Sequence, residues 1–342
     1  MRVDVTGESV TIGRQRGGSD FVWALGRITR KAAISAPPVE VHLWLAAARG
    51  RYVLPRAVPG YLLENLAGVF PEWDSREIDR LAKRHLRFRR QMYLNRVLPL
   101  QRGFKASGAL RMEGGEHLAG TLEGGRGAIL VTGHMGFARL IAPVLRREGW
   151  RVRVVVSASD AVVRHLRRRD QWLDAGGQLR RDVYRRTRVR VDPIDGEAIR
   201  ATLDVRPIFE ALSRNEVVLF AGDGLRAAAF ERMELLGKPY PFPTGFMRIA
   251  MLTRAPVLPV WALPGGVRKI VVRILPPLPV KPDYAVSGNL RLFAGALDDR
   301  LRVAPHLWYR WSETPDLFRR VIRWSESDPG GRHVGDWRLE AV

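Results

Sequence analysis

The sequence predicts an α/β fold: a mixed, mostly parallel sheet flanked by helices, with a helical N-terminal segment and a helical C-terminal tail. Two observations predict it. After Gly103, short apolar runs alternate with segments of helical spacing, the order typical of strands joined by helices. Before Gly103 the patterns are helical only. We therefore expect residues 1–103 to form the N-terminal segment and residues 104–342 the α/β part. A hydrophobic content of 46% is enough for a sizeable core.

The apolar patterns place the elements in order along the chain. Helices are expected at 61–70, 75–98, 137–145, 160–169, 207–213, 244–253 and 290–318, and strands at 128–131, 151–157, 188–192, 216–221, 257–261 and 269–275. Ser75 is the expected N-cap of the second helix, because a serine hydroxyl can accept a hydrogen bond from a helix-start N–H.

Residues 21–48 hold two amphipathic pieces separated by Pro37 and Pro38. The first mixes aromatic and cationic side chains, which suits either a helix lying on a membrane surface or an ordinary helix docked on the core. No stretch reaches the roughly 18 consecutive apolar residues of a spanning helix, and the first thirty residues lack the apolar core of a signal peptide. We therefore expect any membrane contact to be peripheral.

The charge balance favours phosphate-bearing partners. Lys and Arg number 57 against 35 Asp and Glu, a net charge of +22 that suits nucleic acid, an anionic membrane surface or a phosphorylated donor. No nucleic-acid motif accompanies the Arg excess, so we expect no nucleic-acid partner. The absence of Cys excludes disulfides, thiolate metal sites and a Cys nucleophile. No His, Asp and Glu cluster has ligand spacing, so no metal is expected.

His134 is the first candidate for chemistry. It follows the apolar run 128–131 and a Thr-Gly pair, so it lies in a strand-to-helix turn at the carboxyl end of a strand, where α/β sheets usually bind ligands. A neutral imidazole can take a proton from a hydroxyl near pH 7, so a general base is its natural catalytic role. Such a base usually needs a carboxylate that fixes its tautomer and stabilises the imidazolium.

Asp223 is the second candidate. It lies between Gly222 and Gly224 directly after the strand expected at 216–221, so it should lie on the same edge of the sheet as His134. An aspartate between two glycines is equally typical of a simple turn. Position alone leaves both interpretations open.

Further cationic segments are candidates for binding substrate. Within the stretch 230–253, Gly237-Lys238-Pro239 and Pro243-Thr244-Gly245 are expected to form a rigid cationic loop ahead of a helix. Thr244 is the expected helix cap, and Lys238 and Arg248 offer charge to a phosphate or acyl donor. Arg164 and Arg168 belong to a basic cluster in the helix expected at 160–169. That cluster is either a solvated face or, at the same sheet edge, a site for an anionic headgroup or cofactor phosphates.

The order of these pieces resembles the bacterial lipid A biosynthesis (late) acyltransferases, a branch of the lysophospholipid acyltransferase superfamily. The resemblance covers about residues 58–312 and rests on motifs in the family's order. They are Asn65-Leu66 with Phe70-Pro71-Glu72, Gly125-Arg126-Gly127 through Thr132-Gly133-His134-Met135-Gly136, the strand 216–221 ending toward Asp223, the block Leu235 to Val260, and the tail Pro305-His306-Leu307-Trp308-Tyr309-Arg310-Trp311.

The resemblance implies a glycerolipid acyltransferase-like fold and an O-acyltransferase. The acyl group would move from a thioester of acyl carrier protein or coenzyme A, as donor substrate and without another cofactor, to a hydroxyl of a lipid, glycolipid or related acceptor. The reaction would take place at the cytoplasmic face of the bacterial inner membrane, with the protein peripheral, or in the cytoplasm. The His of the family's HxxxxD/E motif is the base and matches His134. Substrate or donor phosphates would be held by residues drawn from Arg139, Arg164, Arg168, Lys238, Thr244 and Arg248.

One residue departs from the family pattern. Arg139 stands where the motif has its acid, and an Arg cannot accept a bond from an imidazole N–H. Asp223 is the first candidate to replace the missing carboxylate, with Asp160 or Asp192 behind it. Alternatively, His134 acts without an orienting acid, or the chain is a catalytically inactive lipid- or acyl-carrier-binding protein of the same fold.

Overall fold

The computed structural model describes residues 58–91, 110–156, 198–199 and 204–312, apart from 226, 228 and 266–268. The described helices are α3 (Gly60–Val69), α4 (Ser75–Gln91), α6 (Gly115–Leu122), α7 (Ile141–Arg147), α10 (Arg206–Ser213), α11 (Gly245–Thr253) and α12 (Val286–Val303), with 3₁₀ turns η3 (Ala138–Leu140), η7 (Pro305–Leu307) and η8 (Tyr309–Ser312). The strands are β1 (Leu110–Glu113), β2 (Ala128–Thr132), β3 (Val152–Val155), β4 (Ala198–Ile199), β5 (Val217–Ala221), β6 (Phe230–Leu235), β7 (Lys238–Pro243), β8 (Val257–Pro264) and β9 (Ile270–Ile274).

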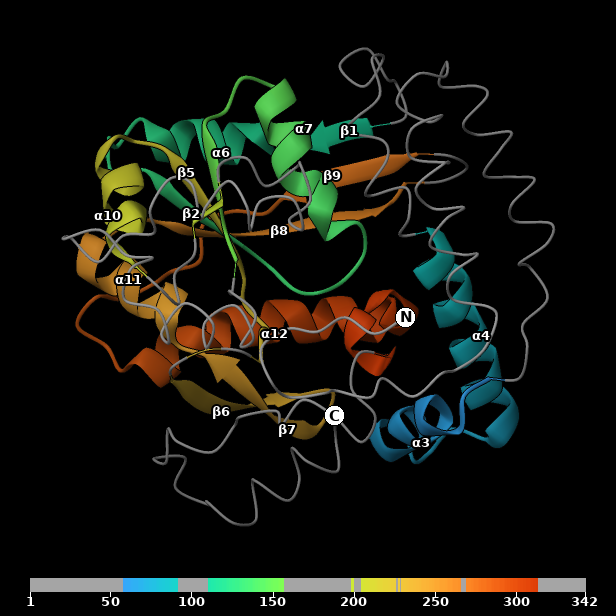
Figure 1. Cartoon of the computed structure of the whole chain (residues 1–342). Helices are drawn as coiled ribbons and strands as arrows, with labels where there is room; N and C mark the ends of the chain where they lie inside the picture. The colour runs from blue at the N-terminus through green and yellow to red at the C-terminus, as the bar shows by residue number, and fades with distance from the viewer. Residues whose placement is uncertain are drawn as a thin grey trace, which may run out of the picture.

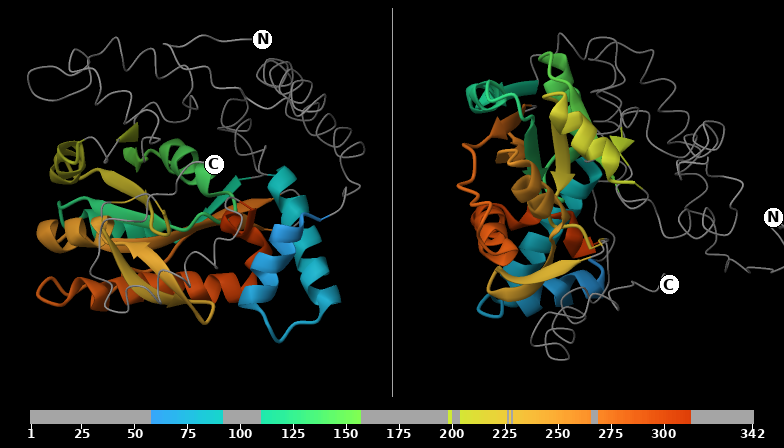
Figure 2. Two further views of the ribbon diagram at one scale, coloured as in Figure 1. Left: turned by 60° about the horizontal axis from the view of Figure 1, so that its bottom comes forward. Right: turned by 90° about the vertical axis from the view of Figure 1, so that its left-hand side faces the viewer.

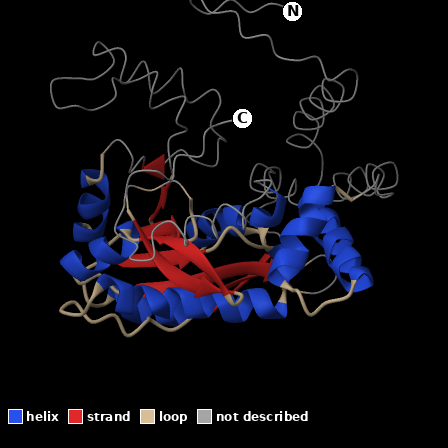
Figure 3. Cartoon of the chain, turned by 90° about the horizontal axis from the view of Figure 1, so that it is seen from below, coloured by secondary structure: helices blue, strands red, loops and turns tan. Residues whose placement is uncertain are grey.

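Seven strands form one mixed, mostly parallel sheet (Figure 1). Their order is β1-β9-β8-β2-β5-β3-β4, and every neighbouring pair is parallel except β8 and β9. Helices flank the sheet, with α7 on one side and α12 on the other (Figures 2 and 3). The α/β fold expected from the alternating patterns is therefore confirmed.

The central strand β2 is buried along its whole length, as expected for a strand covered on both faces. All five of its residues are apolar or Thr, and it lies between β8 and β5. The continuous apolar run at 128–131 is the sequence signature of this position. The core of the protein thus forms around the strand that leads to His134.

The helices α3 and α4 pack against the C-terminal end of the described chain (Figure 1). The buried Asn65 side chain of α3 donates to the Trp311 carbonyl at 3.1 Å. In α4, Nδ1 of the fully buried His85 lies 3.0 Å from the His306 carbonyl oxygen and donates to it. Two segments more than 200 residues apart in sequence therefore support each other next to the sheet edge.

The N-cap of α4 differs from the expected one. The Asp74 side chain accepts the Glu77 backbone N–H at 2.8 Å, and the Glu77 side chain accepts the Asp74 N–H at 3.0 Å. This reciprocal pair is a capping box, and Ser75 is the first helical residue. The expected Ser75 cap was wrong by one position because the Asp74 carboxylate, followed three residues later by Glu77, satisfies the helix-start amides better than a single hydroxyl.

Residues 230–243 form a β-hairpin, which takes in most of the loop expected at 237–245. Strands β6 and β7 pair antiparallel, and the turn residues Leu236 and Gly237 both have positive φ, of 54° and 72°. Positive φ at both central residues is the requirement of a type I′ turn. The prolines at 239, 241 and 243 occupy alternate positions of β7, so their missing N–H groups all fall on one side of the strand. Several prolines in a short segment usually indicate a loop and not a strand. Here the prolines alternate along β7, so the strand can still pair with β6 in a two-stranded hairpin.

The C-terminal helix and tail also differ from expectation. Instead of one helix at 290–318, α12 begins at Val286 and ends at Val303. The tail that follows forms the short turns η7 and η8. Trp308, which lies between these turns, forms an isolated bridge with Met135. The expected helix at 160–169 and strand at 188–192 lie outside the described residues.

Candidate active site

The register of β2 against β5 brings the two candidate residues together. Thr132, the last residue of β2, pairs with Ala221, the last residue of β5. Each strand is followed by a glycine and then by the candidate residue, His134 in one case and Asp223 in the other. The Gly222 N–H continues the ladder by donating to the Thr132 carbonyl at 2.7 Å. Equal offsets from paired residues therefore place His134 beside Asp223.

The two intervening glycines let α12 approach the strand ends closely. A Cβ atom on Gly133 would lie 2.7 Å from a methyl carbon of Leu297, and one on Gly222 would lie 2.4 Å from the Phe293 ring. Neither glycine has a positive φ, so the reason for glycine here is space and not backbone conformation. The sequence requires glycine at these positions because the helix fills the room that a side chain would take.

His134 and Asp223 are joined by hydrogen bonds from both the ring and the backbone. The ring Nδ1 lies 2.6 Å from Oδ1 of Asp223. The His134 backbone N–H also donates to the same carboxylate, 2.9 Å from each oxygen. The His134 side chain keeps 29% of its surface exposed, whereas Asp223 is fully buried. The pair thus consists of an accessible imidazole held by an inaccessible carboxylate.

Other groups complete the shell around Asp223. The Trp308 indole N–H donates to Oδ2 at 2.8 Å, and the Tyr240 hydroxyl donates to the Asp223 backbone carbonyl at 3.0 Å. Burial by itself would raise the pKa of the Asp223 carboxyl. The facing His134 ring, the nearby Arg310 charge and the indole N–H outweigh burial and hold this pKa well below its usual range.

The ionised Asp223 fixes the tautomer of His134. Because a carboxylate can only accept, the hydrogen of the neutral imidazole lies on Nδ1. Nε2 then carries the lone pair and can accept a proton. This is the arrangement that a general base requires, with the orienting acid on the far side of the ring from the reacting proton.

The segment 305–312 encloses the site from the C-terminal side. The Tyr309 N–H donates to the His134 carbonyl at 2.8 Å, and the Gly136 N–H donates to the Leu307 carbonyl at 2.9 Å. The Tyr309 hydroxyl donates to the Gly136 carbonyl at 2.6 Å. Sequence reasoning noted the Trp and Arg residues here only as a family tail and missed their position at the site. The signal that could have found them is the cluster of Trp and Tyr side chains in this tail. When such side chains are buried, their N–H and O–H groups need hydrogen-bond partners elsewhere in the protein.

Arg310 is a second residue that sequence reasoning missed. Its Nη2 atom lies 3.0 Å from Nδ1 and 3.3 Å from Nε2 of His134. An atom at nearly equal short distances from both ring nitrogens lies over the face of the ring, since a position in the ring plane would collide with the carbon between them. The same nitrogen donates to the Asp223 carbonyl at 3.3 Å. Arg310 is buried, with 8% of its surface exposed, so its charge acts close to the imidazole with little screening.

The remaining predicted site residues are dispersed. Arg139 lies in η3 with an exposed side chain, Lys238 is half-buried at the start of β7, and Arg248 is exposed on α11.

Thr244 precedes α11 but its side chain does not cap that helix. Its buried hydroxyl donates to the Ala229 carbonyl at 3.4 Å, so the expected capping role was wrong. The hydroxyl is used in this hydrogen bond and makes none with the helix-start amides. Arg164, Arg168, Asp160 and Asp192 lie outside the described residues.

Neither a metal cluster nor a spanning helix is present in the described part of the chain. Its His, Asp and Glu side chains form no group of three that could hold a metal ion. Among the same residues, no helix has the length and apolar content needed to cross a bilayer.

The comparisons with known proteins identify a family. The family model described as "Bacterial lipid A biosynthesis acyltransferase" matches residues 22–284. This range includes His134 and Asp223 but ends before the segment that carries Trp308 and Arg310. No curated protein matches the chain. Because the family model covers well over half of the sequence, the chain belongs to the bacterial lipid A biosynthesis acyltransferase family.

Proposed function

We propose that the protein is an O-acyltransferase that moves a fatty acyl group from a thioester donor to a hydroxyl acceptor, with His134 as general base. The observation that carries the proposal is the hydrogen bond from Nδ1 of His134 to Asp223, which leaves Nε2 as the accepting atom. Membership of an acyltransferase family supports the reaction class. The partial exposure of the imidazole supports access by a substrate.

The reaction needs one base that later returns its proton. Nε2 takes the proton from the acceptor hydroxyl as its oxygen attacks the thioester carbonyl carbon. When the tetrahedral intermediate collapses, the carbon–sulfur bond breaks, and the imidazolium gives the proton to the departing thiolate. An ester and a free thiol remain, and His134 is neutral again. Neither a metal nor a redox cofactor is required for this balance.

Asp223 has the role that the motif acid has in the family. Its carboxylate holds the ring in one tautomer and stabilises the imidazolium formed during attack. This stabilisation matters because the Arg310 cation over the ring face disfavours a second positive charge there. The acid therefore comes from the neighbouring strand β5, two residues past its end, instead of from the position of Arg139.

The donor is proposed to be a thioester of acyl carrier protein or coenzyme A, and the acceptor a lipid, glycolipid or related alcohol. The net charge of +22 supports phosphate-bearing substrates and peripheral contact with an anionic membrane surface, at the cytoplasmic face of the bacterial inner membrane or from the cytoplasm. Arg139, Lys238 and Arg248 stay as predicted contacts to these phosphates, because each is at least partly exposed.

A thiol-release assay tests the proposal. Purified protein is offered acyl-CoA and acyl carrier protein donors of several chain lengths with a panel of lipid and glycolipid acceptors. Acceptor-dependent thiol release is expected, and His134→Ala should abolish it. The control is His117→Ala, which changes a half-buried histidine of α6. Full activity in His134→Ala would overturn the mechanism.

A second candidate function is binding of lipid or acyl donor without transfer. The observation that favours it is Arg139 in the place of the motif acid, together with the Arg310 cation over the imidazole. This candidate predicts donor binding with no acceptor-dependent thiol release from any pair. The intact hydrogen bond between His134 and Asp223 favours the enzyme.

A further inference from the structure

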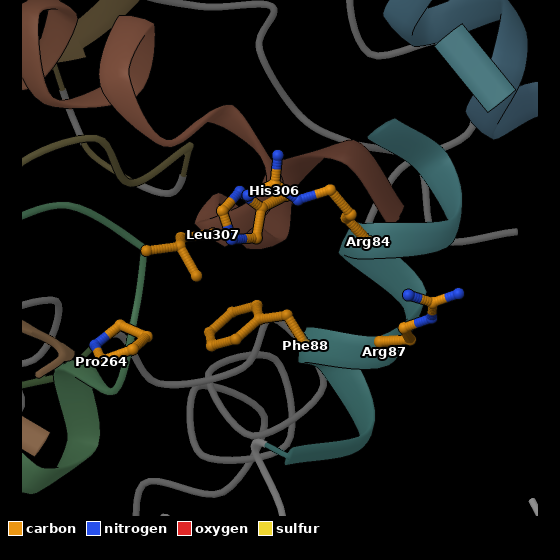
Figure 4. A pocket seen from close by; sticks show the side chains of 6 residues that line it. All are labelled: Arg84, Arg87, Phe88, Pro264, His306 and Leu307. Atoms are coloured by element: carbon orange, nitrogen blue, oxygen red, sulfur yellow. The ribbon is translucent and has the colours of Figure 1, made fainter. Parts of the chain in front are cut away.

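A cavity of about 150 Å³ lies between α4, the end of β8 and the turn η7. It is lined by Arg84, Arg87 and Phe88 of α4, by Pro264 at the end of β8, and by His306 and Leu307 of η7 (Figure 4). This volume is below the roughly 300–1,000 Å³ of sites that enclose a whole small molecule. The cavity is therefore the right size for one part of a larger ligand.

The lining has an apolar side and a cationic side. Figure 4 shows the side chains of Phe88, Pro264 and Leu307 around the empty space, while Arg84 extends beside His306 at its rim. Arg87 lies one turn further along α4 and points away from the centre. No carboxylate lines the cavity, and within the described part of the chain neither arginine forms an ion pair. Two cations with no partner beside an apolar wall match an anionic group attached to an apolar body.

The histidine at the rim is neutral and can donate a hydrogen bond. Burial, and then the Arg84 charge, lower the pKa of His306 to about 4. His306 is held in place from behind, where its backbone carbonyl accepts Nδ1–H of His85. The two guanidinium groups can only donate hydrogen bonds to an anion, and the neutral imidazole can donate one from its N–H.

The cavity is connected to the catalytic pair by packed aromatic rings. The Phe88 ring lies 6.2 Å from the Tyr309 ring, which in turn lies 6.3 Å from the His134 ring, between centroids. The Leu307 carbonyl accepts the Gly136 N–H of the turn that carries His134. Two aromatic rings, those of Phe88 and Tyr309, therefore lie between a ligand group held in the cavity and the proposed base.

We infer that this cavity is a subsite for a phosphate-bearing amphiphile, with the phosphate between Arg84, Arg87 and His306 and the adjoining apolar part against Phe88, Pro264 and Leu307. The identification of this amphiphile as a substrate rests on the proposed acyl transfer. Two substrates could supply the phosphate that binds in this subsite. One is the acceptor lipid, and the other is a coenzyme A donor, whose nucleotide part carries a phosphate. The inferred phosphate position requires the Arg87 side chain, which points away from the cavity in this structure, to turn toward the cavity.

Isothermal titration calorimetry tests the subsite directly. The probes are dihexanoyl phosphatidic acid below its micelle concentration, adenosine 3′,5′-bisphosphate and inorganic phosphate. The test variant is Arg84→Gln/Arg87→Gln. The matched control is Arg76→Gln/Arg80→Gln, which removes the same charge from two exposed positions of the same helix that do not line the cavity. All variants carry His134→Ala, so that binding is measured without turnover.

The test variant is expected to bind one amphiphilic or nucleotide probe about tenfold more weakly, whereas the control keeps the affinity of the parent. Loss with phosphatidic acid assigns the subsite to the acceptor, and loss with the bisphosphate assigns it to the donor. Equal changes in the two variants, or no change in either, would overturn the inference. So would inorganic phosphate binding as tightly as phosphatidic acid, because the apolar wall would then contribute nothing. If the subsite binds its probe and no donor and acceptor pair releases thiol, the inference stands while the proposed function fails.

Discussion

The carboxylate of Asp223 accepts both the ring Nδ1–H and the backbone N–H of His134, with Nδ1 at 2.6 Å and the backbone nitrogen at 2.9 Å. Three constraints on one imidazole follow: its position, its ring orientation and its tautomer. A residue from one strand end thus fixes a residue from the neighbouring strand end.

Asp223→Asn should lower kcat by about 10³–10⁴-fold, because an amide can donate to Nδ1 and leave the hydrogen on Nε2, the wrong tautomer for a base. The fold should be retained, since Asn has the same shape. Steady-state kinetics of thiol release measure the effect. Asp204→Asn is the control, because Asp204 is paired with Arg206 at the start of α10 and should keep full activity. An Asp223→Asn enzyme with normal kcat would show that His134 needs no orienting acid.

The same variant should change the acid stability of the protein. The pKa of Asp223 is lower in the folded than in the unfolded state, so the unfolded chain binds the extra proton as pH falls through the ordinary aspartate range near 3.9. The contribution of the Asp223 carboxyl to the free energy of unfolding is complete above that range. Below it, this contribution falls by about 1.4 kcal/mol per pH unit. Urea unfolding from pH 5 to pH 3 should therefore show a shallower slope in Asp223→Asn. An unchanged slope would contradict the depressed pKa.

Trp308→Phe should lower kcat about tenfold and leave KM unchanged. The fully buried indole cannot touch substrate, but its N–H donates to Oδ2 of Asp223 at 2.8 Å, and hydrogen bonds to charged groups contribute about 1.5–3 kcal/mol. Trp311→Phe is the matched control, since this equally buried indole donates to the Pro305 carbonyl instead. Both variants should lose stability, and only the first should lose kcat. Equal kinetic losses in the two would indicate a packing effect.

Gly222→Ala should destabilise the protein by about 1–3 kcal/mol, because the new methyl group would lie 2.4 Å from the Phe293 ring and 2.6 Å from Val131. Activity should also fall, since Asp223 is the next residue. Chemical unfolding measures the change in stability. Gly120→Ala in α6 is the control, with nothing within 4 Å of the added carbon, and it should be neutral or stabilising by up to about 1 kcal/mol. A Gly222→Ala protein of unchanged stability would mean that α12 can move away freely.

His85 should make the protein less stable as pH falls from about 6.5 to about 4. Burial lowers the pKa of His85 to about 4, so between these values the unfolded chain binds a proton that the folded chain does not. Stability is therefore present above pH 6.5 and lost below it, by about 3 kcal/mol over the whole interval. Unfolding free energies of His85→Gln should depend less on pH in this window. A residual dependence is expected from His306, whose pKa is lowered to the same value.

Much of the fold was predictable because its signals are local. The run at 128–131 is apolar and bounded by glycines, and the described strand is Ala128–Thr132. The hairpin at 230–243 was missed because three prolines usually indicate a loop, and only the pairing with β6 shows that they share one side of the strand. The tail at 305–312 was expected to be helical, whereas its buried indole N–H groups find other partners: that of Trp308 donates to Asp223, and that of Trp311 donates to the Pro305 carbonyl within the tail.

By itself, the sequence determined the two strand ends, each followed by a glycine and then by His134 or Asp223, because strand and turn signals depend on neighbouring residues. It also determined that Arg139 cannot be the orienting acid, since this depends only on the chemistry of a guanidinium group. Only the tertiary structure decided that Thr132 pairs with Ala221 and that Trp308 and Arg310 close around the pair. The physical reason is that register and long-range contacts are set by hydrogen bonds and packing between segments far apart in the chain, which no local pattern encodes.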